Sequence, residues 1–140
     1  MPPFPTKSGY EGFTQNDKFV LKQNQNVYDS FYADIYDKMH LKTRRVSYEL
    51  KTIIETTQAE QENSVFLDIG SGTGIVVGEL QEMGYSAFGV EQSVAMVLHS
   101  QTKHPGLPVK TADVLENPML FERGVFTHLL CLYNTSIIGE

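Results

Sequence analysis

Residues 65–74 read VFLDIGSGTG, and this stretch decides the fold class. A short apolar run ends in Asp68, and glycine then occupies every second position, at Gly70, Gly72 and Gly74. Glycine adopts positive φ angles readily, and because it has no Cβ a ligand can contact the main chain and the next helix can pack closely. The stretch therefore predicts a strand, a ligand-binding loop and a helix, in that order.

Elements of alternating type continue after this loop. IVVGELQEMG predicts a helix that starts at about Thr73 and ends at Gly84, and SAFGVE predicts a strand ending in Glu91. Ser93 is a good N-cap for a helix to about residue 103, with residues 94, 97, 98 and 101 on one side, and a third strand over 109–112 precedes Asp113. FTHLLCLY, residues 126–133, predicts a fourth strand buried on both faces. This alternation predicts an α/β fold with a parallel sheet flanked by helices.

The N-terminal part of the chain predicts a different organisation. Residues 1–26 mix proline, glycine and polar residues without periodicity, which predicts a flexible tail or a lid. Over residues 27–39 apolar side chains recur at three- and four-residue steps, as in an amphipathic helix. A second helical pattern over 46–54 leads through a polar spacer to the first strand. We therefore expect a tail, 1–26, and one domain, 27–140, with a helical leader before the sheet.

The composition of the chain argues against several classes of function. The 140-residue chain has a formal net charge of -6, which argues against a nucleic-acid partner, because such binding rests on clustered Lys and Arg. The single cysteine, Cys131, cannot form an internal disulfide, and no Cys and His set with metal-ligand spacing occurs. No segment approaches the roughly 20 apolar residues of a membrane span. The sequence predicts a soluble, cytoplasmic protein without a metal.

The spacing of the glycines separates the candidate cofactors. A dinucleotide-binding loop has glycines at relative positions 1, 3 and 6, whereas this loop reads D-x-G-x-G-x-G. In this respect the chain resembles the class I S-adenosylmethionine (SAM)-dependent methyltransferases, in which an acidic residue ends the first strand and G-x-G-x-G follows. The matching residues are Asp68, Gly70, Gly72 and Gly74, with Ser71 inside the loop.

The resemblance extends to the next two strand ends. An acidic residue at the end of the family's second strand takes both ribose hydroxyls, and Glu91, followed by Gln92, stands there; the Asp for the adenine amino group corresponds to Asp113, followed by Val114. For either carboxylate taken alone, capping of the following helix is the more usual role. The joint spacing favours SAM as cofactor, held by Asp68, Gly70, Ser71, Gly72, Gly74, Glu91, Gln92, Asp113, Val114 and Tyr32.

Tyr32 enters this set through the leader helix. NVYDSFYADIYD resembles the tyrosine-bearing leader of small, stand-alone family members, and Tyr28, Tyr32 and Tyr36 lie at helical spacing. A stripe of this kind either lines the cofactor site or packs in the core with its hydroxyls at the rim. Tyr32 is the tyrosine that we expect at the site.

The resemblance covers only part of the family's sheet. The family has seven strands in the order 3-2-1-4-5-7-6, and this sequence stops just past the fourth, which leaves the order 3-2-1-4. The fourth strand would then be a bare apolar edge, of the kind that proteins normally cover. The chain is expected to be a truncated form of a longer protein, with self-association through this edge as the alternative.

The resemblance implies methyl transfer to an acceptor. Transfer from a sulfonium is an in-line displacement that needs no enzyme nucleophile, so positioning in a dry site is the main contribution. Tyr133 and Asn134, at the cofactor end of the fourth strand, are the predicted acceptor-positioning residues, whereas His128, at its start, is expected to be structural. The nucleobase amine methylases resemble one another in a [DNS]-P-P-[YFW] tetrad that is absent here, which favours a small-molecule or protein acceptor.

Two other functions remain open from the sequence. A non-catalytic SAM-fold binding module or partner subunit would explain the missing strands and an uncovered, apolar fourth-strand edge. A nucleotide-dependent oxidoreductase using Glu91 on a ribose is disfavoured by the glycine spacing.

Overall fold

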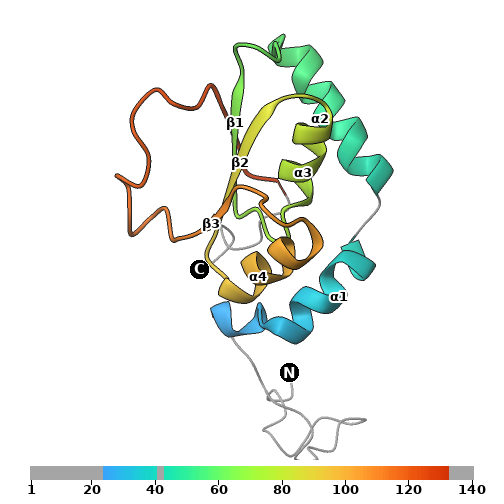
Figure 1. The fold of residues 1–140 in the computed structure, drawn as a ribbon, viewed down its shortest axis with the longest axis vertical. Coiled ribbons are helices and arrows are strands. Elements are labelled where there is room, and N and C mark those ends of the chain that lie inside the picture. The colour runs from blue at the N-terminus through green and yellow to red at the C-terminus, as the bar shows by residue number, and fades with distance from the viewer. Residues whose placement is uncertain (1–23, 41–42, 133–140) are drawn as a thin grey trace, which may run out of the picture.

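The computed structural model describes residues 24–40 and 43–132 (Figure 1). Of the predicted tail or lid, residues 1–26, only residues 24–26 are described, and Tyr133 and Asn134 also lie outside the described residues. In chain order the elements are the 3-10 helix η1 (Asn24–Val27), α1 (Ser30–His40), α2 (Thr43–Thr57), β1 (Val65–Ile69), α3 (Ile75–Glu82), β2 (Ser86–Glu91), α4 (Val94–Lys103), β3 (Val109–Thr111) and β4 (His128–Leu130).

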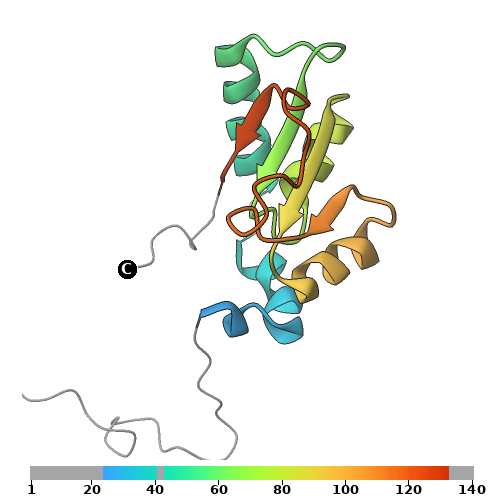
Figure 2. The ribbon, with the colours of Figure 1, turned by 90° about the vertical axis from the view of Figure 1, so that its left-hand side faces the viewer.

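The sheet has the predicted topology. Its four strands are parallel and lie in the order β3-β2-β1-β4. The predicted α/β fold with a Rossmann-like sheet and a helical leader is therefore confirmed. Figure 2 shows that the carboxyl ends of the strands point towards α1. Residues that follow the strands consequently gather between the sheet and the leader helix.

The core lies between the sheet and the helices. Helices α2, α3 and α4 lie on one side of the sheet, and the segment 112–127 loops out on the other (Figure 1). The periodic apolar residues of the helices supply most of the core, as expected for amphipathic elements. Its buried members are Val46, Leu50, Phe66, Val76, Val77, Leu80, Ala87, Leu107 and Leu130.

Strand β4 differs from the prediction. It spans three residues, and while Leu130 is buried in the core, Leu129 is 64% exposed. The register aligns Leu129 with Leu67, and Leu67 with Phe88, so these side chains share the sheet face away from the helices. The prediction that this strand is buried on both faces is wrong, because the described residues cover that face incompletely.

Helix α4 (Val94–Lys103) buries a different face from the one that the sequence predicts. Ser93 is the N-cap, as predicted, and its Oγ accepts the Met96 N–H at 3.2 Å. The buried face consists of Met96, Val97 and Ser100, whereas Val94 and Leu98 of the predicted stripe are exposed. Small Ser100 faces inward because α4 packs closely against the glycine loop there.

Candidate functional site

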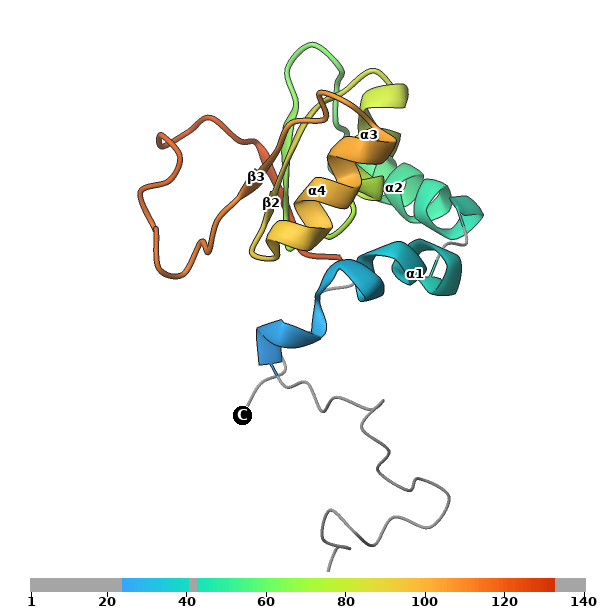
Figure 3. The same cartoon turned by 60° about the horizontal axis from the view of Figure 1, so that its bottom comes forward.

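The site is built at the carboxyl ends of the first three strands. Asp68 lies in β1, the glycine loop 70–74 follows it, Glu91 ends β2, and Asp113 follows β3. Because neighbouring parallel strands end at the same edge of a sheet, these residues face one region. In Figure 3, α1 lies beside α4 below this edge.

The glycine loop combines an open position with a closely packed one. Gly72 has φ +55°, and a Cβ added to it would meet Tyr36 Cε1 at 4.0 Å. Gly74 has φ +80°, and a Cβ added there would lie 2.5 Å from Leu107 Cδ2. Gly72 therefore leaves space beside the main chain, whereas Gly74 allows close packing. The following helix begins at Ile75 rather than near Thr73, because the left-handed Gly74 is its N-cap.

Glu91 ties the glycine loop to the start of α4. Its Oε2 accepts the Gly72 N–H at 2.9 Å, and its Oε1 accepts the Ser93 N–H at 2.8 Å. The contact to Ser93 is at the start of α4, which is the capping role that the sequence left open for Glu91. The contact to Gly72 holds the glycine loop. Each carboxylate oxygen can accept more than one hydrogen bond, so capacity remains for a ligand hydroxyl.

Asp68 is buried beside the same loop. Its side chain is 2% exposed, the Leu132 main-chain N–H donates to its carboxyl group, and its Oδ1 has no hydrogen-bond partner among the described residues. Burial, together with the nearby charge of Glu91, raises the pKa of Asp68 to about 8. Ser71 Oγ is also buried without a partner in the described part of the chain. Two buried polar groups that the described residues leave unpaired, at and beside one loop, indicate a polar ligand there.

Asp113 completes the polar edge. Gln92 Nε2 donates to Asp113 Oδ2, and the Leu115 N–H donates to Oδ1 at 2.8 Å. Asp113 and Val114 are half-buried, whereas Gln92 is exposed. The structure therefore brings Gln92 and Asp113 together, next to Glu91 at the end of β2.

The leader tyrosines form a row of rings. The centroids of Tyr28 and Tyr32 are 5.4 Å apart, and those of Tyr32 and Tyr36 are 5.6 Å apart. Burial raises the pKa of both Tyr32 and Tyr36 above 10, and neighbouring tyrosines raise both further. Both phenols are therefore neutral near pH 7 and cannot serve as bases. Tyr36, which the sequence did not single out over Tyr32, is the ring that reaches Gly72.

Two further residues, His128 and Gly89, support the packing of the strands and of the glycine loop. His128 stacks on Phe66 with centroids 4.4 Å apart, and its Nε2 lies 3.1 Å from Thr57 Oγ1, which fits the structural role expected for it. Gly89 of β2 was not singled out by the sequence; a Cβ there would lie 2.7 Å from Ser71 Oγ. A glycine in β2 is thus needed for Ser71 to pack at the loop.

Sequence reasoning also missed Asp37, a buried acid of α1 whose Oδ1 accepts from Thr73 Oγ1 in the glycine loop at 2.6 Å. Ala33, four residues earlier on the same helix face, is also buried, but this face does not carry the apolar pattern of the sequence, so no local signal identifies Asp37.

Within residues 24–40 and 43–132, no group of three or more His, Cys, Asp or Glu residues could hold a metal ion. None of the helices described there has the length and apolar character to cross a membrane.

Comparison with known proteins identifies the fold. No family model and no curated protein matches the chain. Among solved structures, DesVI of Streptomyces venezuelae matches with a TM-score of 0.59 and 21% identity, over 74% of this chain and 43% of that one. CalS10 of Micromonospora echinaspora, an amino pentose methyltransferase solved with SAM bound, gives 0.56 and 20% identity over 86% and 45%. KedS8 of Streptoalloteichus sp. ATCC 53650, a sugar N-methyltransferase, gives 0.52 and 26% identity over 89% and 46%.

The described part of the chain therefore has the class I SAM-dependent methyltransferase fold, as the glycine loop and the acidic strand ends predicted. The chain spans less than half the length of each of these three structures.

Proposed function

We propose that this chain forms the cofactor-binding part of a SAM-dependent methyltransferase. The observation that carries the proposal is a pair of buried groups, Asp68 Oδ1 and Ser71 Oγ, that have no hydrogen-bond partner among residues 24–40 and 43–132 and lie beside a left-handed glycine loop. Unpaired polar groups of this kind are costly unless a ligand satisfies them. The same fold in SAM-bound CalS10 supports the assignment.

The donor and acceptor chemistry of the site fits this cofactor. SAM presents hydrogen-bond donors along its length: an ammonium group, two ribose hydroxyls and an adenine amino group. The chain presents one carboxyl group for each of these three parts of the cofactor, with Asp68 proposed for the amino-acid part, Glu91 for the ribose and Asp113 for the adenine. Ser71, Gln92, Val114 and the main chain at Gly70, Gly72 and Gly74 complete the proposed cradle, with Tyr32 above it.

The contribution of the chain to the chemistry is positioning. When bound, SAM supplies a methyl group on a sulfonium, which an acceptor takes by in-line displacement. The chain's own residues bind and orient the cofactor, and α1 helps to exclude water from the strand ends. Tyr133 and Asn134 are proposed to orient the acceptor.

The acceptor is proposed to be a small molecule or a protein side chain. The net charge of -6 disfavours nucleic acid. The amino group of a sugar is the first acceptor to test, because CalS10 and KedS8 are described as an amino pentose and a sugar N-methyltransferase.

Cofactor discrimination tests the proposed function. Purified protein is titrated calorimetrically with SAM and, separately, with NAD. We expect saturable binding of SAM and none of NAD. Binding of NAD without SAM would overturn the proposal in favour of an oxidoreductase, and binding of neither by a folded sample would leave the fold without the proposed site.

The protonation of Asp68 predicts a signature of binding. Its pKa of about 8 keeps most of the carboxyl groups protonated at pH 7. A positively charged ligand favours the carboxylate, so SAM binding at pH 7 is expected to release protons, up to one per site. Plotted against the ionisation enthalpy of the buffer, the measured binding enthalpies should then fall on a sloping line, because the buffer takes up the released proton. Asp68→Asn should abolish the slope, and a flat line for the unmodified protein would contradict the expectation.

The same pKa shift fixes the pH dependence of stability in the ligand-free protein. Folding raises the pKa of Asp68 from 3.8 to about 8, so the folded state binds more protons between these values. The contribution of this group to stability is therefore fully present below about pH 4 and is lost as the pH rises through 8. Asp68→Asn should remove this component from the difference in melting temperature between pH 6 and pH 8.

A further inference from the structure

Asp37 is a buried acid on α1 that the proposed cofactor contacts do not use. Its residue is 3% exposed, and three side chains converge on its carboxylate. Thr73 Oγ1 donates to Oδ1 at 2.6 Å, Lys103 Nζ pairs with Oδ2, and His99 Nε2 lies 3.3 Å from Oδ2. We call these four residues the Asp37 network. It joins the leader helix to the glycine loop and to α4.

The charges of this network keep Asp37 ionised. Burial alone would raise its pKa, but hydrogen bonds from Lys103, Thr73 and His99, together with the Lys103 charge, lower the pKa below its usual value. A charged acceptor forms stronger hydrogen bonds than a neutral one. The contact to Thr73 is thus a strong constraint on the loop.

The glycine loop is held from two sides. Thr73 stands between Gly72 and Gly74, both of which have left-handed φ angles. Glu91 holds the Gly72 N–H from the end of β2, and Asp37 holds the Thr73 hydroxyl from the leader helix. Because a ligand of the loop lies against its main chain, both contacts bear on the shape of the binding surface.

The leader helix lies outside the main hydrophobic cluster. Among the described residues this cluster contains members of α2, α3 and the strands but none of α1, although Ala33 of α1 is itself buried. In addition to the Asp37 network, Ser93 Oγ donates to the Tyr28 carbonyl at 2.6 Å, and His99 Nδ1 lies 3.3 Å from the exposed Asp34. An element held in this way can undock without disrupting the core.

We propose that Asp37 is a positioning residue: through Thr73 it sets the glycine loop in its ligand-binding conformation, and it couples docking of the leader helix to cofactor binding. The choice of SAM as ligand rests on the proposed function, whereas the effect on the loop does not. Coupling of this kind is reciprocal, so SAM should also protect α1 from hydrogen exchange.

Paired variants test the proposal. Thr73→Val keeps the shape of threonine but lacks the hydroxyl, and Thr73→Ser keeps the hydroxyl. Asp37→Asn removes the charge, and Asp34→Asn removes a charge beside the same histidine without touching the loop. We expect Thr73→Val and Asp37→Asn each to raise the Kd for SAM by about tenfold or more, and Thr73→Ser and Asp34→Asn to change it by less than about twofold.

A double variant separates positioning from general support of the fold. If Asp37 acts through Thr73, Thr73→Val added to Asp37→Asn should cause little further loss, whereas independent roles would give multiplied effects. Multiplied effects, or unchanged affinity in folded Thr73→Val, would overturn the proposal. If Asp37→Asn does not fold, the Thr73 pair still decides the outcome.

Hydrogen exchange in the ligand-free protein distinguishes the positioning role of Asp37 from the proposed binding of SAM. In the ligand-free protein, amide exchange over residues 70–74 should be roughly tenfold faster in Thr73→Val and Asp37→Asn than in Asp34→Asn. Faster exchange in a protein that binds no SAM would refute the proposed function and retain the positioning role. Equal exchange in all three variants would refute the positioning role even if SAM binds.

Discussion

Glu91→Ala is expected to weaken SAM binding by about 100-fold or more, about 2.7 kcal/mol. In the proposed complex the carboxylate accepts the ribose hydroxyls, and hydrogen bonds to a charged group contribute roughly 1.5 to 3 kcal/mol each. The substitution also removes the acceptor that holds the Gly72 N–H at 2.9 Å, so the loop loses one of the side-chain contacts that hold it. Glu91→Gln keeps one acceptor oxygen and should lose about tenfold. Calorimetric titration at a fixed pH measures both.

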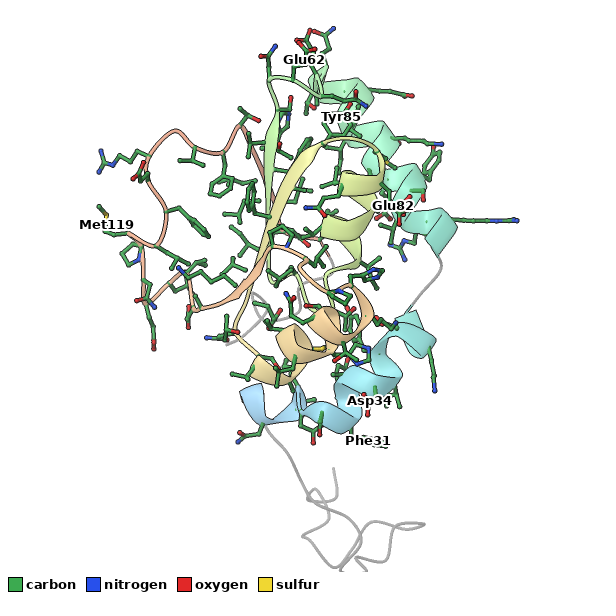
Figure 4. The ribbon with its side chains drawn as sticks, viewed as in Figure 1. Phe31, Asp34, Glu62, Glu82, Tyr85 and Met119 are labelled. Atoms are coloured by element: carbon green, nitrogen blue, oxygen red, sulfur yellow. The ribbon has the colours of Figure 1, made fainter. Side chains whose placement is uncertain are left out.

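The matched control for Glu91 is Glu62→Ala. Glu62 is exposed and precedes β1, at the end of the sheet opposite to α1 (Figure 4). The Glu62→Ala substitution removes the same charge from the chain, and the Kd of this variant for SAM should stay within about twofold of that of the unmodified protein. A folded Glu91→Ala variant that binds SAM as well as Glu62→Ala does would refute the proposed ribose contact.

Gly72→Val is expected to abolish SAM binding. The backbone at Gly72 has φ +55°, and the space beyond its Cα is open up to Tyr36 Cε1, 4.0 Å from an added Cβ. The valine methyl groups would extend into the space in which the ligand is proposed to approach the main chain. The left-handed conformation costs a side-chain-bearing residue about 1 to 2 kcal/mol, so the variant should fold with reduced stability.

Gly106→Val separates strain from steric exclusion. Gly106 has φ +83° and open space around an added Cβ, in the turn between α4 and β3. This control should therefore lose a similar amount of stability in thermal unfolding and still bind SAM. Equal binding by the two variants would show that nothing lies against the main chain at Gly72.

The fold was predictable from the sequence because its determinants are local. The alternation of strand and helix, the glycine loop and the Ser93 N-cap each depend on residues close together in the chain. Their consequences, a parallel sheet in the order β3-β2-β1-β4 and a capped α4, are found in the structure.

The features that were not predicted depend on long-range packing. Asp37 meets Thr73, His99 and Lys103, which are 36, 62 and 66 positions away, so no local pattern reveals the network. The buried face of α4 is set by the close approach of Ser100 to Gly74 rather than by the distribution of apolar residues. The exposure of Leu129 depends on what covers the sheet, which its own strand sequence does not encode.

The candidate site was partly predictable. The sequence identified Asp68 by its place just before the glycine loop, and Glu91 and Asp113 by their order after it. The structure brings all three to the same edge of the sheet. The raised pKa of Asp68 was not foreseen, because it results from burial and from the nearby Glu91 charge. The position of Tyr36 over Gly72 depends on how α1 docks, which helical spacing alone does not determine.

The most direct test of the proposed site is an NMR titration of ¹⁵N-labelled protein with SAM, followed amide by amide. We expect saturable shifts at the glycine loop, residues 70–74, at Glu91 and Gln92, and around Asp113, with smaller ones along α1. Glu62 and the end of α3 at Glu82, which lie at the opposite end of the sheet (Figure 4), should not shift. Saturable shifts confined to that opposite end, or no shifts in a folded sample at millimolar SAM, would contradict the proposed site.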